Sequence, residues 1–281
     1  MANSSMSTQL QGMTAAITGA GRGIGRGIAI VLASRGAAIS LSDVDVDSAQ
    51  AVAGEIEKAG GRAIAARVDV TSQDSLNEWI DLSIKELGKV DICVPNAGVI
   101  GATGFTERKN YNNDDWRLTW DINVRGMINT ADAVVPHMKD RNFGKIVNIA
   151  SHGGRAPRGV PDPGRGSVQM PYSVSKAAAI QWTHLLAIEL GRYNINVNAV
   201  CPGRLWTPMW EAIALNHKAL NPYVAGLSAR EIFDRNIKAT MPLGRPQTPE
   251  DIGKAVAFLA SEDAAQITGQ ALNVNGGAIM S

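Results

Sequence analysis

The chain has 281 residues, of which 45% are hydrophobic and 19% are charged. A chain of this kind can bury one substantial core, so we expect one large domain rather than two small ones. The formal net charge is +1, so no global field attracts nucleic acid or an anionic membrane, and neither partner is expected.

The N-terminal residues 1–11 are polar, and we expect a flexible end rather than a signal peptide, because they hold neither a cationic start nor an apolar run. No stretch of the sequence is long and apolar enough to cross a bilayer. Cys93 and Cys201 each lie in a short apolar run and are predicted to be reduced core residues, which fits a cytoplasmic protein.

Short apolar runs alternate with longer segments of helical period along the whole chain. Strands are expected over residues 14–18, 37–43, 63–70, 90–98, 144–151, 195–203 and 270–277. Helices are expected over 23–35, 47–59, 73–87, 249–260, near 115–138 and near 172–191. This alternation predicts an α/β fold, with a parallel sheet covered by helices on both faces and right-handed crossovers.

The segment 155–170 interrupts this rhythm with "RAPRGVPDPGRG", which is too rich in Pro and Gly for a helix or a central strand. Its Arg155, Arg158 and Arg165 could bind a polar or anionic substrate, because guanidinium groups match carboxylate and phosphate oxygens. The alternative is a solvated bulge or a subunit contact. We hypothesise that the segment forms one wall of a substrate pocket.

The second interruption covers residues 204–246. Apolar residues at helical spacing in "TPMWEAIA" indicate a lid helix that packs on its own domain. Trp206, Met209 and Trp210 could instead form a wall against a substrate. Both interruptions follow the ends of predicted strands, where ligands bind in open α/β sheets.

A glycine-rich turn, "TGAGRGIG", follows the first strand and opens a helix. Its Gly19, Gly23 and Gly25 would let a pyrophosphate approach the backbone at the helix N-terminus, although a tight strand-to-helix connection would look the same. Asp43 closes the second strand, where a carboxylate can accept from both ribose hydroxyls and repel a 2′-phosphate. NAD is therefore favoured over NADP, although Arg22 in the turn could meet a phosphate and Asp43 could be an ordinary turn residue.

The stretch "PYSVSKAAA" places Tyr172 and Lys176 four residues apart at the start of a helix, so they share one face. A nearby ammonium favours the phenolate of tyrosine, so the pair could act as a base at neutral pH. Alone, such a pair is more often a surface pair. Ser151 at the end of "NIAS" and Asn123 in "WDINVRG" strengthen the catalytic interpretation.

In these motifs the chain resembles the short-chain dehydrogenase/reductase family, from about residue 12 to the C-terminus. The other matching motifs are "DVT" at 69–71, "NAG" at 96–98, "NAVCPG" at 198–203 and "ITGQALNVNGG" at 267–277. The resemblance implies a Rossmann-type doubly wound parallel sheet, with residues 12–281 as one dinucleotide-binding catalytic domain, and a homotetramer. The interval from Ser151 to Tyr172 is longer than is typical of the family, and segment 155–170 is the insertion.

The resemblance also implies the roles of individual residues. The catalytic tetrad would be Asn123, Ser151, Tyr172 and Lys176. Cofactor contacts would come from Gly19, Arg22, Gly23, Ile24, Gly25, Asp43, Asp69, Val70, Asn96, Ala97, Gly98, Tyr172, Lys176, Pro202, Gly203, Leu205 and Thr207. Substrate contacts would come from His152, Gly153, Trp206, Met209 and Trp210. No metal site is predicted, because His137, His184 and His217 lack the spacing of ligands.

The expected function is NAD-dependent hydride transfer to or from a secondary alcohol or ketone of a small polar molecule. "TPMW" and the "NVNGGAIMS" end favour a polyol, sugar alcohol or vicinal diol. The alternatives are a 3-oxoacyl-carrier-protein reductase, a hydroxysteroid dehydrogenase or a nucleotide-sensing regulator that has lost turnover.

Overall fold

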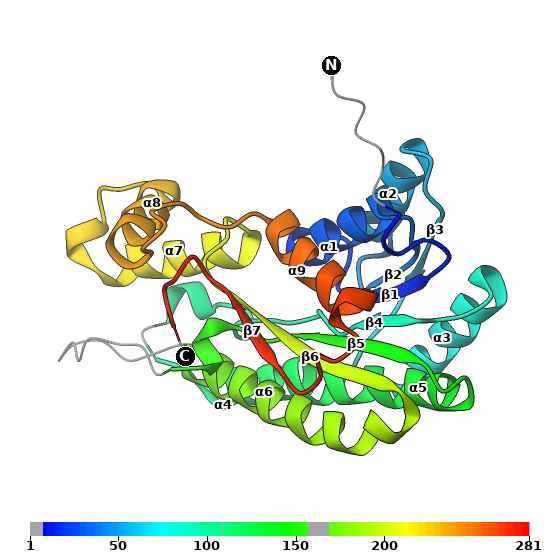
Figure 1. Cartoon of the computed structure of the whole chain (residues 1–281). Helices are drawn as coiled ribbons and strands as arrows, with labels where there is room; N and C mark the ends of the chain where they lie inside the picture. Colours follow the sequence, from blue (N-terminus) through cyan, green and yellow to red (C-terminus); the bar gives the residue numbers. More distant parts are fainter. Residues whose placement is uncertain (1–7, 109, 157–168, 281) are drawn as a thin grey trace.

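A computed structural model describes residues 8–108, 110–156 and 169–280. Its centre is a parallel sheet in the order β3-β2-β1-β4-β5-β6-β7 (Figure 1). The strands are β1 (Thr14–Thr18), β2 (Ala38–Asp43), β3 (Ala63–Arg67), β4 (Ile92–Val94), β5 (Gly144–Ile149), β6 (Ile195–Pro202) and β7 (Ala271–Val274). The strand order reverses between β1 and β4, and ligands bind outside the carboxyl ends of the strands at such a switch point.

Two layers of helices cover the sheet (Figure 1). One layer holds α1 (Gly23–Ser34), α2 (Val46–Lys58) and α9 (Pro249–Ala260). The other holds α3 (Gln73–Leu87), α4 (Asn113–Trp120), α5 (Gly126–Asp140) and α6 (Met170–Leu190). The fold is therefore the predicted α/β, Rossmann-type doubly wound sheet in a single domain.

Burial on both faces explains the near-continuous apolar runs of the strands, since side chains of a parallel sheet meet helices on either side. Strands β1, β5 and β6 are buried along their whole length. Ile17 and Leu32 belong to the core cluster on the side of α1, and Ile146 and Trp79 belong to the cluster on the side of α3. Both cysteines are buried free thiols in this core, as the sequence predicted.

The helix expected near 115–138 is divided into α4 and α5 by a π-helical turn, Asp121–Arg125. The N–H of Gly126 bonds to the C=O of Asp121, five residues earlier, so the chain gains one residue within the helix. Apolar periodicity does not reveal such a turn, because the apolar residues on either side keep a helical spacing. Turns of this type occur frequently at functional sites.

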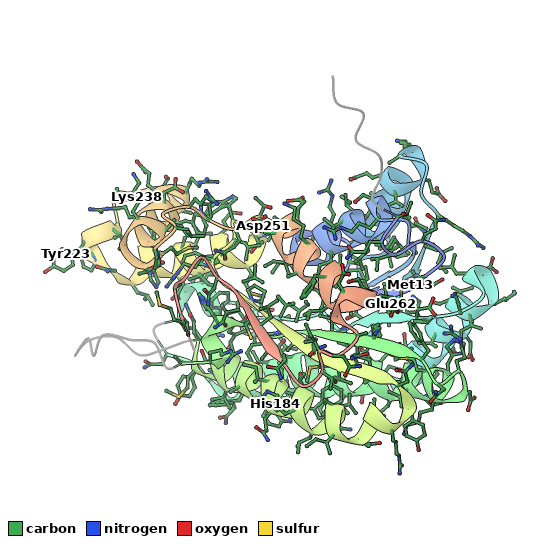
Figure 2. The ribbon with its side chains drawn as sticks, in the orientation of Figure 1. Met13, His184, Tyr223, Lys238, Asp251 and Glu262 are labelled. Carbon is green, nitrogen blue, oxygen red and sulfur yellow. The ribbon has the colours of Figure 1, made fainter. Side chains whose placement is uncertain are left out.

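The segment 204–246 contains two helices, α7 (Pro208–Leu220) and α8 (Ala229–Thr240), whereas the sequence indicated one lid helix. Ser228 and Glu231 form a capping box at the start of α8, which is the signal that could have predicted it. The two helices form a lobe beyond the carboxyl edge of the sheet (Figure 1). Tyr223 and Lys238 lie on its outer side, away from the sheet (Figure 2).

Candidate active site

The glycine-rich turn lies between β1 and α1. Gly19 and Gly23 have φ of 62° and 55°, in the left-handed region that favours glycine. A Cβ on Gly25 would stand 2.2 Å from the C=O oxygen of Gly19, so only glycine lets the turn close on the helix. No side chain caps α1, and its first turn holds no acidic residue, so its first N–H groups can meet an anion.

The end of β4 holds this turn in place. The Asn96 amide donates to the C=O oxygens of Thr18 and Gly19, both at 2.9 Å. In return, the Thr18 hydroxyl accepts the N–H groups of Asn96 and Ala97 at 3.0 and 3.1 Å. The predicted cofactor residues Asn96 and Ala97 thus brace the backbone of the predicted phosphate turn.

Asp43 lies at the end of β2 beside the same turn. Its carboxylate accepts the N–H of Gly21 at 3.0 Å and the N–H of Asp45 at 3.1 Å. Hydrogen bonds from Ser48 lower the pKa of Asp45, and the charge of Arg22 lowers it further by a smaller amount. Arg22 therefore lies near the acidic turn that follows Asp43, so one cation and two carboxylates border this end of the site.

Asp69 and Val70 follow β3, next to the end of β2. The Asp69 carboxylate accepts both the N–H and the hydroxyl of Thr71, at 2.9 and 2.7 Å. Val70 is buried, and its C=O accepts a hydrogen bond from Asn129 at 3.1 Å. These bonds fix the shape of the turn.

Ser151 and the pair Tyr172 and Lys176 come from different elements, β5 and α6. They meet because Gly154 packs against the α6 backbone: a Cβ on Gly154 would stand 2.5 Å from the carbonyl carbon of Lys176. A side-chain hydrogen bond joins Ser151 to Tyr172. The Lys176 ammonium donates to the C=O of Ile149 at 2.8 Å and lies 5.8 Å from the centre of the Tyr172 ring.

Burial changes the proton affinity of both α6 side chains. Burial raises the pKa of Tyr172, and the hydrogen bond with Ser151 lowers it by a smaller amount. Burial lowers the pKa of Lys176 to about 8. The direction for Tyr172 is opposite to the lowering expected from the sequence, because desolvation of the phenol is the larger effect and Lys176 bonds to a backbone carbonyl.

Asn123 lies in the π-helical turn and ties this turn to the segment after β4. Its side chain accepts the N–H of Val99 at 2.8 Å and donates to the C=O of Val99 at 2.9 Å. It also donates to the hydroxyl of Ser175 on α6 at 3.0 Å. The position of a Cβ on Gly98 would be 3.3 Å from Asn123 Oδ1 and 3.5 Å from Lys176 Nζ, so the four predicted catalytic residues lie at one place.

The end of β6 leads from this place to α7. The N–H of Gly203, after Pro202, donates to the C=O of Val274 at 3.0 Å, and Leu205 pairs with Gln247. Thr207 caps α7, and its methyl group is 3.8 Å from the position of a Cβ on Gly23. Thr207 therefore lies beside the glycine turn, while Ile24 packs into the core beneath α1.

The predicted substrate residues come from two places, the turn after Ser151 and the segment that leads into α7. His152 is buried in the turn after Ser151, and the N–H of Gly153 donates to the Ser151 hydroxyl at 3.0 Å. Met209 and Trp210 of α7 pack in one apolar cluster with Tyr172. Trp206 and Trp210 stack edge-on against Phe233 of α8, at 5.3 and 5.1 Å between ring centres.

The sequence did not point to three apolar residues that pack against these side chains. Ile100 and Phe105 lie in the cluster of Tyr172, and Phe233 lies in the cluster of Trp206 and Trp210. The apolar residues that follow "NAG" in the sequence could have indicated Ile100 and Phe105. Of the proposed insertion, Arg155 hydrogen-bonds the Cys201 sulfur, while residues 157–168, with Arg158 and Arg165, lie outside the described residues. Among the described residues, no group of three or more His, Cys, Asp or Glu side chains could hold a metal ion.

A family model described as enoyl-(acyl carrier protein) reductase matches residues 19–278. A crystal structure of a short-chain type dehydrogenase/reductase from Mycobacterium marinum matches with a TM-score of 0.80 and 30% identity, covering 98% of each chain. The chain belongs to the short-chain dehydrogenase/reductase family. It is accordingly an oxidoreductase that acts on alcohol or ketone groups.

Relatives of this short-chain dehydrogenase/reductase act on different substrates. The chain is 34% identical to (2S)-[(R)-hydroxy(phenyl)methyl]succinyl-CoA dehydrogenase subunit BbsD of Thauera aromatica, over 95% of this chain and 97% of the relative. It is 34% identical to 7α-hydroxysteroid dehydrogenase of Escherichia coli K12, over 96% of each. Levodione reductase matches with a TM-score of 0.83 and 28% identity, over 95% of this chain and 98% of that chain.

The close contact of Gly154 with the α6 backbone can be tested by substitution in this short-chain dehydrogenase/reductase. The Gly154→Ala substitution pushes Ser151 away from Tyr172, and a displacement of 1 Å can cost about 100-fold in rate, so we expect a loss of that order. Turnover is measured together with the circular dichroism spectrum. Gly191→Ala at the other end of α6 is the control, because nothing lies within 4 Å of its Cβ position. Equal turnover in the two variants would contradict the conclusion that the Gly154 contact places Ser151 beside Tyr172.

Proposed function

We propose that this chain transfers a hydride between the nicotinamide of NAD(H) and a secondary alcohol or ketone of a small-molecule substrate. The observation that carries the proposal is the meeting of Asn123, Ser151, Tyr172 and Lys176 beside the glycine turn. A related structure, 34% identical to this chain with a TM-score of 0.80 and covering 100% of this chain and 99% of that one, is 7α-hydroxysteroid dehydrogenase complexed with NADH and 7-oxo glycochenodeoxycholic acid.

The residues along the carboxyl edge of the sheet fit a dinucleotide. The open N-terminus of α1 and the glycines before it suit the pyrophosphate, and Asp43 suits the hydroxyls of the adenosine ribose. Asp69 and Val70 would border the adenine, Asn96 to Gly98 the adjacent ribose, and Pro202 to Thr207 the nicotinamide end. When bound, the nicotinamide supplies or accepts the hydride. The Asp43 charge supports NAD over NADP, because it would repel a 2′-phosphate.

The side chains of the tetrad hold the substrate oxygen and move its proton. The Ser151 hydroxyl donates a hydrogen bond to that oxygen, and Tyr172 Oη gives it a proton when a ketone is reduced or takes the proton when an alcohol is oxidised. Because burial raises the pKa of Tyr172, the phenol is protonated at neutral pH. The neutral phenol can donate the proton that the carbonyl oxygen takes up when a ketone is reduced, and the Lys176 ammonium lies beside it to stabilise the phenolate that forms.

Two classes of substrate are candidates, and the side chains that pack around Tyr172 bear on the choice between them. The sequence prediction of a polyol, sugar alcohol or vicinal diol stays a prediction, supported by the "TPMW" motif. The apolar cluster of Tyr172 with Ile100, Phe105, Met209 and Trp210 supports a second candidate, an alcohol or ketone on an apolar ring, as in a hydroxysteroid. Burying a ring against this wall contributes about 25 cal/mol per Å² of apolar surface, which a polyol cannot gain.

The α6 face that points away from the sheet supports a homotetramer, which we also propose. Ile188 and Leu185 are 81% and 56% exposed there, and His184 lies on the same side (Figure 2). Apolar side chains this exposed on adjacent turns mark an interaction surface. A cytoplasmic location is supported by the two free thiols. No described helix is long and apolar enough to span a membrane.

The function is tested with purified protein, NADH or NADPH, and a panel of polyol-derived and cyclic ketones, by absorbance of the reduced nicotinamide. We expect turnover with NADH in preference to NADPH, and a loss of nearly all turnover in Tyr172→Phe, because the variant lacks the proton donor. Binding of NADH, followed by its fluorescence, is expected to stay unchanged in that variant. NADH binding without turnover of any ketone would instead support a nucleotide-sensing regulator.

The two shifted pKa values predict the pH dependence of ketone reduction. Below about pH 8 both the Tyr172 phenol and the Lys176 ammonium hold their protons, so kcat/KM is expected to be constant. Above about pH 8 Lys176 loses its charge, and kcat/KM should fall about tenfold per pH unit. Lys176→Arg is the control, because its guanidinium stays charged. The same fall in that variant would show that another group titrates.

The oligomer is tested by light scattering. The wild type is expected to have the mass of four chains, and the double variant Leu185→Lys, Ile188→Lys to form smaller species, because like charges would meet in the apolar interface. Lys218→Gln, at an exposed position of α7, is the control. A monomeric wild type would contradict the homotetramer.

A further inference from the structure

Asn216 is a buried amide on an otherwise apolar face of α7. It is 4% exposed and follows Met209 by seven residues, or two helical turns, so the two side chains share a face. Ile213, between them, packs against Ile100 and Phe105. A leucine at position 216 would continue this apolar stripe, whereas burying an amide costs free energy unless it is hydrogen-bonded.

The Asn216 amide nitrogen reaches three backbone carbonyls of the segment after β4. Its distances to the C=O oxygens of Phe105, Thr106 and Arg108 are 2.9, 3.1 and 3.0 Å. These carbonyls lie in and directly after a one-turn 3-10 helix, Phe105–Glu107. The C=O of Phe105 also accepts the N–H of Arg108 at 3.3 Å, so the amide adds to the hydrogen bonds that end this turn. One side chain of α7 is therefore hydrogen-bonded to the end of a segment more than a hundred residues away in sequence.

The same segment is fixed to the catalytic elements at its other end. Asn123 binds both backbone groups of Val99. The carboxylate of Asp115 on α4 is fully buried, accepts the N–H of Ala102 at 2.8 Å and pairs with the Arg108 guanidinium. Segment 99–108 thus joins the Asn123 turn, α4 and α7 into one unit.

We infer that Asn216 is a positioning residue, which couples α7 to segment 99–108 and thereby sets where Met209 and Trp210 stand relative to Tyr172. The inference rests on the proposed function, because it takes the substrate to bind between Tyr172 and α7. Without the amide, the contact of Ile213 with Ile100 and Phe105 remains, but apolar contacts are non-directional and do not fix how far α7 slides along the segment. Met209, two turns before Asn216, would move with the helix.

The test is Asn216→Leu, which keeps the size and the apolar stripe but removes the donor. We expect the KM for a ketone substrate to rise about tenfold to 100-fold, with a smaller change in kcat, because the wall facing the substrate is displaced while the tetrad stays in place. The dissociation constant of NADH, from its fluorescence, should be unchanged. Hydrogen–deuterium exchange should become faster in both 99–108 and 208–220. Asn216→Ser, a smaller change that retains one donor, is expected to give intermediate values of KM and exchange.

Ser83→Ala is the matched control for lost stability. It removes a buried hydroxyl that bonds to Ser40 and to the C=O of Trp79, both at 2.7 Å, in the α3 layer. Its melting temperature is expected to fall while its KM stays that of the wild type. An equal rise of KM in Ser83→Ala and Asn216→Leu, or faster exchange in α7 alone, would overturn the inference.

The exchange measurement separates this inference from the proposed function. If the wild type reduces no ketone of the panel, the proposed function is wrong, and coupled exchange in the two segments still supports the link made by Asn216. If the wild type is active and Asn216→Leu shows its KM and its exchange rates unchanged, the proposed function stands and the positioning role is refuted.

Discussion

Ser151 ends strand β5, whereas Tyr172 and Lys176 begin helix α6, and the two elements can present one site only where their backbones meet. That meeting point is Gly154, where a Cβ would come within 2.5 Å of the Lys176 backbone. A second link between the two elements is the hydrogen bond that the Lys176 ammonium on α6 donates to the C=O of Ile149 on β5. The insertion then leaves from directly beyond Gly154, so its extra length need not disturb the distance from Ser151 to Tyr172.

Around this contact, side-chain amides tie the loops of the site together. Asn96 holds the glycine turn, Asn123 holds the segment after β4, and Asn216 joins that segment to α7. Each loop at the carboxyl edge carries backbone groups that are hidden from water and need partners. An amide offers two donors and an acceptor without the desolvation cost of an ion, so it can satisfy such groups at a fixed geometry. These bonds hold the loops at fixed positions relative to one another.

The strands and the glycine turn have local signatures, namely the alternation of apolar runs and glycines at set positions. The tetrad has only one, Tyr172 four residues before Lys176, and the roles of Asn123 and Ser151 came from the family resemblance. The π-helical turn at Asn123 could not be predicted from the sequence, since it leaves the apolar spacing of the flanking helices intact. Asn216 could not be predicted either, because the three backbone carbonyls to which it donates are distant in sequence. The pKa of Tyr172 was given the wrong direction because burial by α7 and by segment 99–108 is a tertiary effect that spacing does not contain.

The site has a polar side and an apolar side, and they contribute to catalysis differently. In the proposed function, the Ser151 and Tyr172 groups act on the reacting oxygen, where charge changes in the transition state, so their interactions would lower the barrier. Met209, Trp210 and Ile100, which pack in one cluster with Tyr172, would meet parts of the substrate that do not react, and would stabilise bound substrate and transition state alike. That uniform binding becomes useful for the rate only if it holds the carbonyl in line with Tyr172. The alignment would depend on the position of α7. Segment 99–108 contacts both Asn123 and Asn216, so in the proposed function it would link substrate binding on the apolar side to proton transfer on the polar side.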